Sequence, residues 1–234
     1  LERMAIHTGD IGAVCGDMAY QLGSAVLGRL RTPLVNFMQE WCGNRLSKGL
    51  VRPGVNRFAF TQALADRLNH LLDDYERDFV EVTDKLFTLP SALSRLERTG
   101  VVTQNDAMEL GAVGMAARAS GVLRDVRATH PLGLYAHIQH EPVVLASGDV
   151  HARVDLRRKE VLLSLGYIRN WLSDLPKPSL PVDFPSAKPN HFCVSMTEGW
   201  RGEICHCAIT GNNGELVHYK IKDPSFHNWM ALAL

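Results

Sequence analysis

Residues 200–229 read WRGEICHCAITGNNGELVHYKIKDPSFHNW and contain the clearest local pattern of the chain. Two short apolar runs, 204–210 and 216–221, flank a turn of glycine and asparagine at 211–214. Because these two residue types tolerate the positive φ angles of tight turns, the pattern predicts an antiparallel β hairpin. The hairpin would hold Arg201 at the start of its first strand, and an aromatic segment would follow its second strand.

Most of the remaining sequence has a helical pattern. Apolar residues recur at steps of three and four over residues 60–87 and again over 147–172, which predicts two long amphipathic helices. A stretch rich in glycine and alanine at 4–30 predicts a closely packed central helix, and Thr32-Pro33 is expected to begin the next helix. The expected fold is therefore mainly α: a helical bundle with long amphipathic helices and a small C-terminal antiparallel β hairpin or sheet.

Prolines mark the boundary between the helical part and the hairpin. Five of them, at positions 176, 178, 181, 185 and 189, exclude regular structure there. We expect one structural domain with a helical bundle at 1–176, a proline-rich crossing loop at 177–190, and the hairpin with the start of a C-terminal helix at 191–234. The first residue is not methionine and both ends fall within helical patterns, so we expect a piece of a longer protein, truncated at both ends.

Composition narrows the class of protein. The 25 basic and 25 acidic residues balance, so nothing in the charge favours binding to nucleic acid or to an anionic membrane. Five cysteines without CxxC spacing favour a reducing compartment, and the cytoplasm is the expected location. No apolar run approaches the roughly 20 residues of a membrane-spanning helix, so we expect no direct membrane span.

The Cys205-His206-Cys207 triplet resembles a metal motif only at first sight. Alternate residues of a strand face opposite sides, so Cys205 and Cys207 would share one face while His206 points to the other. We therefore expect reduced, buried cysteines and no metal site in this chain. The isolated Cys15, Cys42 and Cys193 are likewise expected to belong to the core.

Arg201 is the strongest candidate for a functional residue. It lies between Gly199 and Gly202, which leave the guanidinium little side-chain cover. A guanidinium stays protonated and offers rigid donors to an oxyanion, a quinone carbonyl or a metal-bound ligand. The structural alternative is a salt bridge at the hairpin base, with Glu203 or another carboxylate.

Three ionisable residues, His7, Asp10 and Asp17, follow one another along one face of the predicted small-residue helix. Unpaired charge is costly to bury, so their alignment indicates either a polar cavity or proton path, or simple capping and pairing with Arg29 or Arg52. Both interpretations remain open from the residues alone.

A second charged group comprises Arg118, Asp125 and Arg127. We expect these residues to form a structural ion-pair network around an ordered loop, and Arg52 to take part in structural ion pairing as well. No GxGxxG after a strand and no Walker lysine is present, so a nucleotide site is not supported.

Taken together, these segments resemble the large subunit of the membrane-bound, formate hydrogenlyase type (group 4) nickel-iron hydrogenases and its relative, the 49 kDa quinone-site subunit of complex I (NADH-quinone oxidoreductase). The similar blocks follow the family's order along nearly the whole chain. They are Leu1-Glu2-Arg3 through His7 with Asp10-Ile11-Gly12 and Asp17; Gly43-Asn44-Arg45 with Val51-Arg52-Pro53-Gly54-Val55; Arg118-Ala119-Ser120-Gly121 with Asp125 and Arg127; Gly148-Asp149-Val150 with Arg153 and Arg157; and Arg201-Gly202-Glu203 through Pro224-Ser225-Phe226.

The resemblance implies roles for particular residues. Arg201 matches the arginine that overhangs the nickel-iron centre, although Trp200 replaces the proline that often precedes it. Asp17 matches an acidic residue of the complex I quinone chamber, and His7 matches a histidine beside it on the same helix. Family hydrogenases hold nickel and iron with two CxxC motifs, one near each end of the large subunit, and neither motif is present in this chain.

The resemblance also implies a setting. We expect an interior portion of the large subunit of an oxidoreductase that transfers electrons to protons or quinone, while the isolated piece is expected to be inactive. No cofactor is expected in this chain; a nickel-iron centre would belong to the longer parent and iron-sulfur clusters to a partner small subunit. Membrane subunits and quinone are the other expected partners, with the complex on the cytoplasmic side of the inner membrane. The alternative is a metal-free scaffold or coupling subunit of such a complex.

Overall fold

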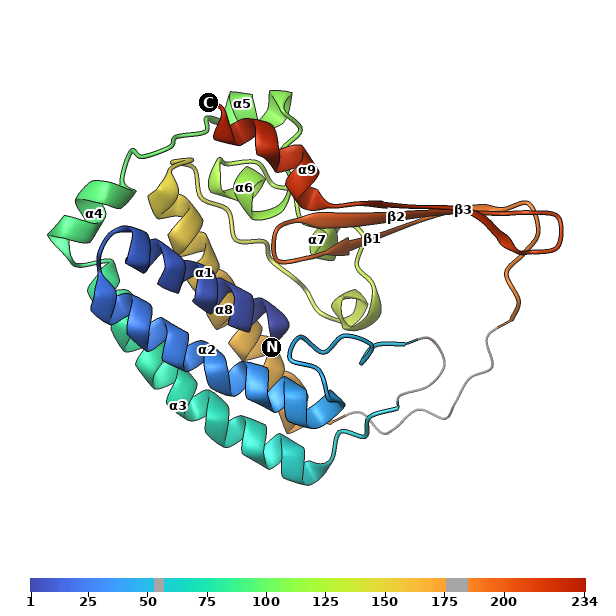
Figure 1. Ribbon diagram of the computed structural model, residues 1–234, viewed down its shortest axis with the longest axis horizontal. Coiled ribbons are helices and arrows are strands. Elements are labelled where there is room, and N and C mark those ends of the chain that lie inside the picture. The colour runs from blue at the N-terminus through green and yellow to red at the C-terminus, as the bar shows by residue number, and fades with distance from the viewer. Residues whose placement is uncertain (53–56, 176–184) are drawn as a thin grey trace. The chain divides into compact units, whose positions relative to one another are not determined.

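The computed structural model describes residues 1–52, 57–175 and 185–234 (Figure 1). The chain divides into two compact units, residues 1–95 with 157–184 and residues 96–156 with 185–234. The expected division at residues 176 and 190 stays a prediction, because most of the proline-rich segment, 176–184, lies outside the described residues.

The first unit is helical. It contains α1 (Glu2–Asp17), α2 (Gln21–Cys42), α3 (Gln62–Leu86), nearly all of α4 (Pro90–Leu96), and the part of α8 (Val150–Ser173) that begins at Arg157. Helices α1, α2 and α3 lie side by side, with α2 contacting both of the others (Figure 1). The long amphipathic helix expected at 60–87 is α3, and Thr61 caps it by accepting a hydrogen bond from the Leu64 amide.

The stretch expected to be one helix over residues 4–30 is two. The chain turns between α1 and α2 at Ala19, whose φ of 60° is left-handed. The prediction that Thr32-Pro33 begins a helix was wrong, because Pro33 lies inside α2. Buried Leu30 and Leu34 lie on either side of Pro33, so apolar packing of the helix face offsets the backbone hydrogen bond that a proline cannot make.

The core of the first unit is apolar with one buried polar pair. The Thr8 and Tyr75 hydroxyls lie 2.6 Å apart and satisfy each other where α1 meets α3. The largest fully buried apolar side chains of this unit are Phe37, Phe79, Met4, Ile11, Leu27, Leu34, Met38, Leu72 and Leu86.

The second unit combines short helices with a sheet. Its helices are α5 (Gln104–Glu109), α6 (Gly114–Ala119), α7 (Val126–Thr129), the 3-10 helix η1 (Gly133–His137), the first turns of α8, α9 (Pro224–Asn228) and the 3-10 helix η2 (Trp229–Leu232). A full capping box between Thr103 and Asp106 starts α5. Apolar side chains pack these short elements, with Met115, Ala119, Ala152 and Leu156 forming one buried cluster.

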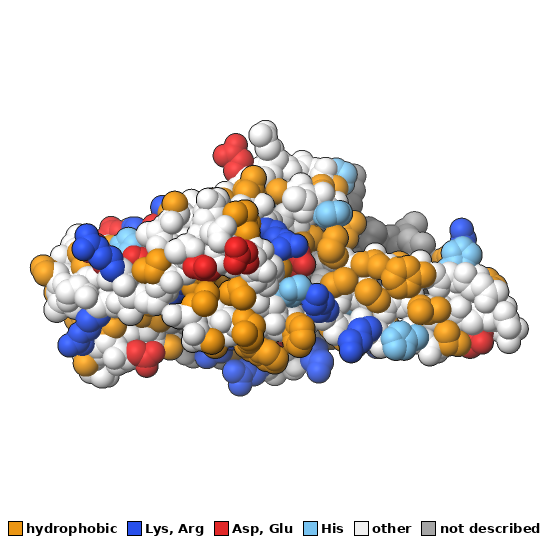
Figure 2. All heavy atoms as spheres, turned by 90° about the horizontal axis from the view of Figure 1, so that it is seen from above, with side chains coloured by type: hydrophobic (Ala, Val, Ile, Leu, Met, Phe, Trp, Pro, Cys, Tyr) orange, Lys and Arg blue, Asp and Glu red, His pale blue; other side chains and the backbone are white. Residues whose placement is uncertain are grey.

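The sheet has three antiparallel strands, β1 (Phe192–Glu198), β2 (Glu203–Thr210) and β3 (Leu216–Lys222), in the order β1-β2-β3. The hairpin expected from residues 204–221 is β2-β3, and β1 is an additional strand paired with β2 from Phe192↔Ile209 to Glu198↔Glu203. Every residue of β3 is exposed. Figure 2 shows hydrophobic side chains beside lysines and histidines on the surface of this part of the chain.

Candidate functional site

Arg201 lies on the tight turn that joins β1 to β2. The backbone closes this turn twice: the Gly199 amide donates to the Gly202 carbonyl at 2.8 Å, and the Gly202 amide donates to the Gly199 carbonyl at 3.4 Å. Gly202 is buried and has a φ of +137°, a conformation that favours glycine. It packs against Gly114, where α6 begins, so the position of the Arg201 backbone is fixed by two glycines in contact.

The Arg201 side chain itself is exposed. Within the described residues it makes no hydrogen bond and no ion pair, and Glu203 pairs instead with Arg124 at 3.7 Å. The alternative of a hairpin-base salt bridge to Glu203 is therefore not what the structure contains. The nearby Asp223 has a lowered pKa, chiefly because the Ser225 backbone amide donates to its carboxylate, and the charge of Arg201 adds to the effect.

Behind this turn lies a buried charged cluster, which we define as Arg118, Asp125, Arg127, His140 and Glu198. Asp125 is at its centre: the Arg127 guanidinium donates to it at 2.9 and 2.6 Å, and the His140 ring lies 3.2 Å away. Arg118 adds a second guanidinium group at 3.6 Å. The three residues expected to form a structural ion-pair network thus lie together.

The pKa values of the two carboxyl groups in this cluster are shifted in opposite directions. Burial alone would raise the pKa of Asp125, but hydrogen bonds from His140 and Arg127 and the charges of both arginines hold it well below its usual range. Burial, and then the charge of Asp125, raise the pKa of Glu198 to about 7. Sequence reasoning missed both Glu198 and His140, because each lies far along the chain from the charged residues that it contacts.

A small cavity of about 70 Å³ adjoins the cluster. Glu198, Arg127, Tyr135 and His130 are among the residues that line it. His130 is exposed and Tyr135 is half-buried, so the cavity lies between the buried Glu198 and the surface of this unit, and most of its wall is apolar.

The three ionisable residues of α1 occupy different environments. His7 is buried, Asp10 is half-buried and accepts from the Arg157 guanidinium at 3.2 Å, and Asp17 is exposed at the end of the helix. The expectation of a buried helix carrying all three was wrong for Asp17. The partner of Asp10 is Arg157, not either of the arginines considered from the sequence.

Arg52 does not take part in the ion pairing expected of it. Within the described chain its guanidinium donates to the Gly49 carbonyl at 2.9 Å and meets no carboxylate. Arg29, the other arginine considered as a partner for α1, pairs with Asp78 at 2.6 Å.

The cysteines of β2 follow the alternation of the strand. Cys205 and Cys207 share one face, with their sulfur atoms 3.9 Å apart, while His206 bonds to the Tyr219 hydroxyl on the other. Cys205 and Cys207 are half-buried, and Cys15 and Cys42 are buried. Cys193 is exposed, so its assignment to the core was wrong: it lies on the outer strand β1, where no element of the described residues covers it.

Among the described residues, no three or more His, Cys, Asp or Glu side chains are grouped so as to hold a metal ion. A nickel-iron centre needs several thiolates, and the close thiol pair of β2 supplies only two. The described residues therefore do not fit such a centre by themselves.

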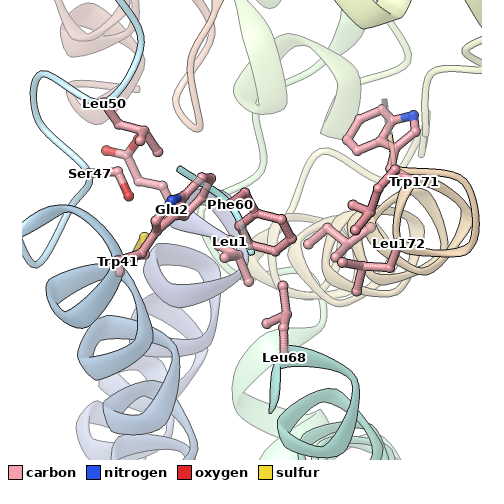
Figure 3. Close-up of a pocket in the computed structure, with 12 residues that line it drawn as sticks. Leu1, Glu2, Trp41, Ser47, Leu50, Phe60, Leu68, Trp171 and Leu172 are labelled. Atoms are coloured by element: carbon pink, nitrogen blue, oxygen red, sulfur yellow. The ribbon is translucent and has the colours of Figure 1, made fainter. Parts of the chain in front are cut away.

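The first unit contains a separate, apolar cavity of about 350 Å³. Its walls come from the beginning of α1, the end of α2, the segment around Phe60, and the end of α8. Figure 3 shows Phe60 at its centre, near Leu1 and Leu68. None of the candidate site residues named above lines it, so we assign it no chemistry.

Comparison with known proteins identifies the family. The family model for the 49 kDa subunit of the respiratory-chain NADH dehydrogenase matches residues 17–190. The chain belongs to this family. The match includes every member of the buried charged cluster except Glu198, and it ends before the Arg201 turn.

Individual relatives extend the similarity over the whole chain. Formate hydrogenlyase subunit 5 of Escherichia coli is 27% identical over 99% of this chain and 41% of its own length. The membrane-bound hydrogenase subunit alpha of Pyrococcus furiosus is 27% identical over 100% of this chain and 58% of its own length. An NADH-quinone oxidoreductase subunit of Rickettsia rickettsii is 27% identical over 81% of this chain and 48% of its own length. The chain thus spans about half the length of these relatives.

The resemblance to hydrogenase and complex I large subunits is thereby confirmed. The relatives favour a subunit of an oxidoreductase over the scaffold alternative. No helix within the described residues is both long and apolar enough to cross a membrane.

Proposed function

We propose that this chain is the interior portion of the large subunit of a membrane-associated oxidoreductase complex that passes electrons to protons or to quinone. The Arg201 guanidinium carries the proposal: it is exposed, it makes no ion pair in the described chain, and its backbone is held by the Gly114–Gly202 contact. A guanidinium presented from a held backbone can stabilise negative charge that develops on a substrate oxygen or on a metal-bound ligand.

Removal of the guanidinium should lower turnover in the parent complex. We expect Arg201→Met to reduce electron-transfer activity on the order of 100-fold, the usual cost of losing one preorganised donor in an active site. Arg201→Lys keeps the positive charge and should lose less of the electron-transfer activity. Steady-state rates of the purified complex give the comparison.

Lys220→Met is the matched control, because Lys220 is an exposed cation of the same sheet. It should leave turnover unchanged. Equal activity of Arg201→Met and wild type would exclude a catalytic role for Arg201.

The metal content of the parent separates two versions of the proposal. In the hydrogenase version the parent holds nickel and iron through cysteines that this chain lacks; in the quinone reductase version it does not. Elemental analysis of the purified full-length parent protein tells them apart, since a metal-free parent that supports quinone reduction would eliminate the hydrogenase version.

The setting of the parent complex belongs to the same proposal. An iron-sulfur small subunit would provide or accept the electrons, and membrane subunits would anchor the complex on the cytoplasmic side of the inner membrane. His7, Asp10 and Asp17 are proposed residues of a quinone or proton path. The ion pair between Asp10 and Arg157 and the exposure of Asp17 make His7 the best supported of the three, because it alone is buried.

A further inference from the structure

Glu198 is the least expected member of the buried charged cluster. It ends β1, is only 7% exposed, and accepts a hydrogen bond from the Val126 amide at 3.1 Å. The Arg118 guanidinium lies 3.7 Å from its other oxygen. The protein therefore places a second carboxyl group beside Asp125 in a buried setting.

The groups that face Glu198 come from every element packed around it. Arg118 faces it from α6, and Asp125 and Arg127 face it from the start of α7. His140, in the segment after η1, contacts Asp125. Glu203 is its partner on β2 and is itself paired with Arg124.

Asp125 already carries the negative charge of this cluster, through its contacts with both arginines and His140. Burial and the negative charge of Asp125 favour the neutral acid at Glu198, whereas the hydrogen bond from the Val126 amide and the charges of Arg118 and Arg127 favour the carboxylate; of these effects burial is the largest. A neutral carboxylic acid at Glu198 avoids the burial cost, which outweighs the attraction of the two arginines.

The cavity of about 70 Å³ gives this carboxyl group a way to exchange a proton. Its volume suffices for water, and the side chains of Glu198, Arg127, Tyr135 and the exposed His130 contribute the polar part of a wall that is otherwise largely apolar. Water there would connect the buried carboxyl to solvent.

We propose that Glu198 is a proton-binding site, which holds a proton inside the buried charged cluster and exchanges it with solvent through the cavity beside Tyr135 and His130. The upward shift of its pKa to about 7 agrees with this assignment and means that the proton binds and leaves near neutral pH. Proton binding here requires nothing from outside this chain.

The position of Glu198 suggests what the proton is for. Gly199 follows Glu198 directly and is hydrogen-bonded across the same tight turn that carries Arg201. Reduction of protons or quinone consumes protons, so a protonated carboxyl beside the Arg201 turn would serve as a reservoir for that reaction. This second step rests on the function proposed above, whereas the proton-binding site does not.

Infrared spectroscopy tests the proton site in the full-length protein within its parent complex. We expect a carboxylic acid C=O band that disappears between about pH 5 and pH 9 with a midpoint near pH 7. Labelling glutamate with ¹³C should shift this band, and Glu198→Gln should remove it. Glu203→Gln, the matched control on the paired strand, should retain it. If Glu198→Gln fails to assemble, Glu198→Asp should move the band without removing it.

The turnover of the same complex tests the role of the proton. Glu198→Gln should lose an ionisation near pH 7 that wild type and Glu203→Gln both show, with a rate loss on the order of tenfold or more. Absence of a Glu198-dependent band, with Glu198 ionised at about pH 5 like an ordinary glutamate, would overturn the inference even in an active complex. A complex that shows the band but transfers no electrons would instead refute the proposed function and leave the proton site standing.

Discussion

Replacement of Asp125 by alanine is expected to destabilise the fold by about 3–5 kcal/mol, because it leaves the buried Arg118 and Arg127 guanidinium groups without their shared carboxylate. Both side chains of the closest pair are almost completely buried, and Asp125 also caps α7 through the Arg127 amide. The free energy of unfolding, measured by denaturant titration with circular dichroism, gives the value for the chain and its variant.

Glu81→Ala provides the control for this experiment, since Glu81 pairs with Lys85 on the exposed face of α3. Its loss should change stability little, because solvent screens such pairs. A loss for Asp125→Ala no greater than that for Glu81→Ala would show that the buried cluster contributes nothing.

Acid should also destabilise the unchanged chain, because it protonates the buried Asp125 carboxylate. The folded-state pKa of Asp125 is depressed, so its contribution is present above the ordinary pKa of aspartate and is lost as pH falls through the folded value. Glu198 has the opposite sign: its raised pKa means that its contribution is present at acid pH and is lost as pH rises through about 7. At pH values above the ordinary pKa of aspartate, the stability that Asp125 provides should not vary with pH.

Gly114→Ala is expected to disrupt the Arg201 turn. A Cβ atom at Gly114 would lie against the Cα of Gly202 and within 2.5 Å of the Arg201 carbonyl oxygen, and all of these neighbours are backbone atoms that cannot rotate away. Gly114 also has a φ of +61°, which strains any other residue. We expect a loss of about 4 kcal/mol or more, which is at the exceptional end for a single substitution.

Gly111→Ala separates the clash from the strain. Gly111 has a nearly identical φ of +66°, but a Cβ there would meet nothing within 4 Å. This variant should lose only about 1 kcal/mol from the left-handed backbone. In the parent complex, Gly114→Ala should also lower turnover towards that of Arg201→Met, while Gly111→Ala should leave turnover unchanged. Equal effects of the two substitutions on turnover would contradict the proposal that the Gly114–Gly202 contact holds the Arg201 backbone in place.

The regular elements could be predicted because their signals are local. The period of the apolar residues and the cap at Thr61 define α3, and the Gly-Asn turn defines the β2-β3 hairpin. The opposite faces of Cys205 and His206 likewise follow from the two-residue repeat of a strand.

The features that sequence reasoning missed depend on contacts between distant segments. Nothing near Glu198 in the sequence indicates that it lies beside Arg118, 80 positions earlier. The left-handed position of the turn between α1 and α2 is Ala19, a residue type that does not indicate a turn. Helix α2 continues through Pro33 because the buried apolar face on both sides of it continues. Asp17 was placed on a buried helix, and Arg52 in an ion pair, by residue type alone, whereas exposure and pairing depend on where each element ends.

Electron transfer by the purified parent complex tests the central claim most directly. The complex should reduce a quinone, or evolve or oxidise hydrogen, and the activity should fall on the order of 100-fold in Arg201→Met while Lys220→Met retains it. A fully assembled complex that performs neither reaction, whether it contains the wild-type or the variant chain, would contradict the assignment of this chain to a catalytic oxidoreductase.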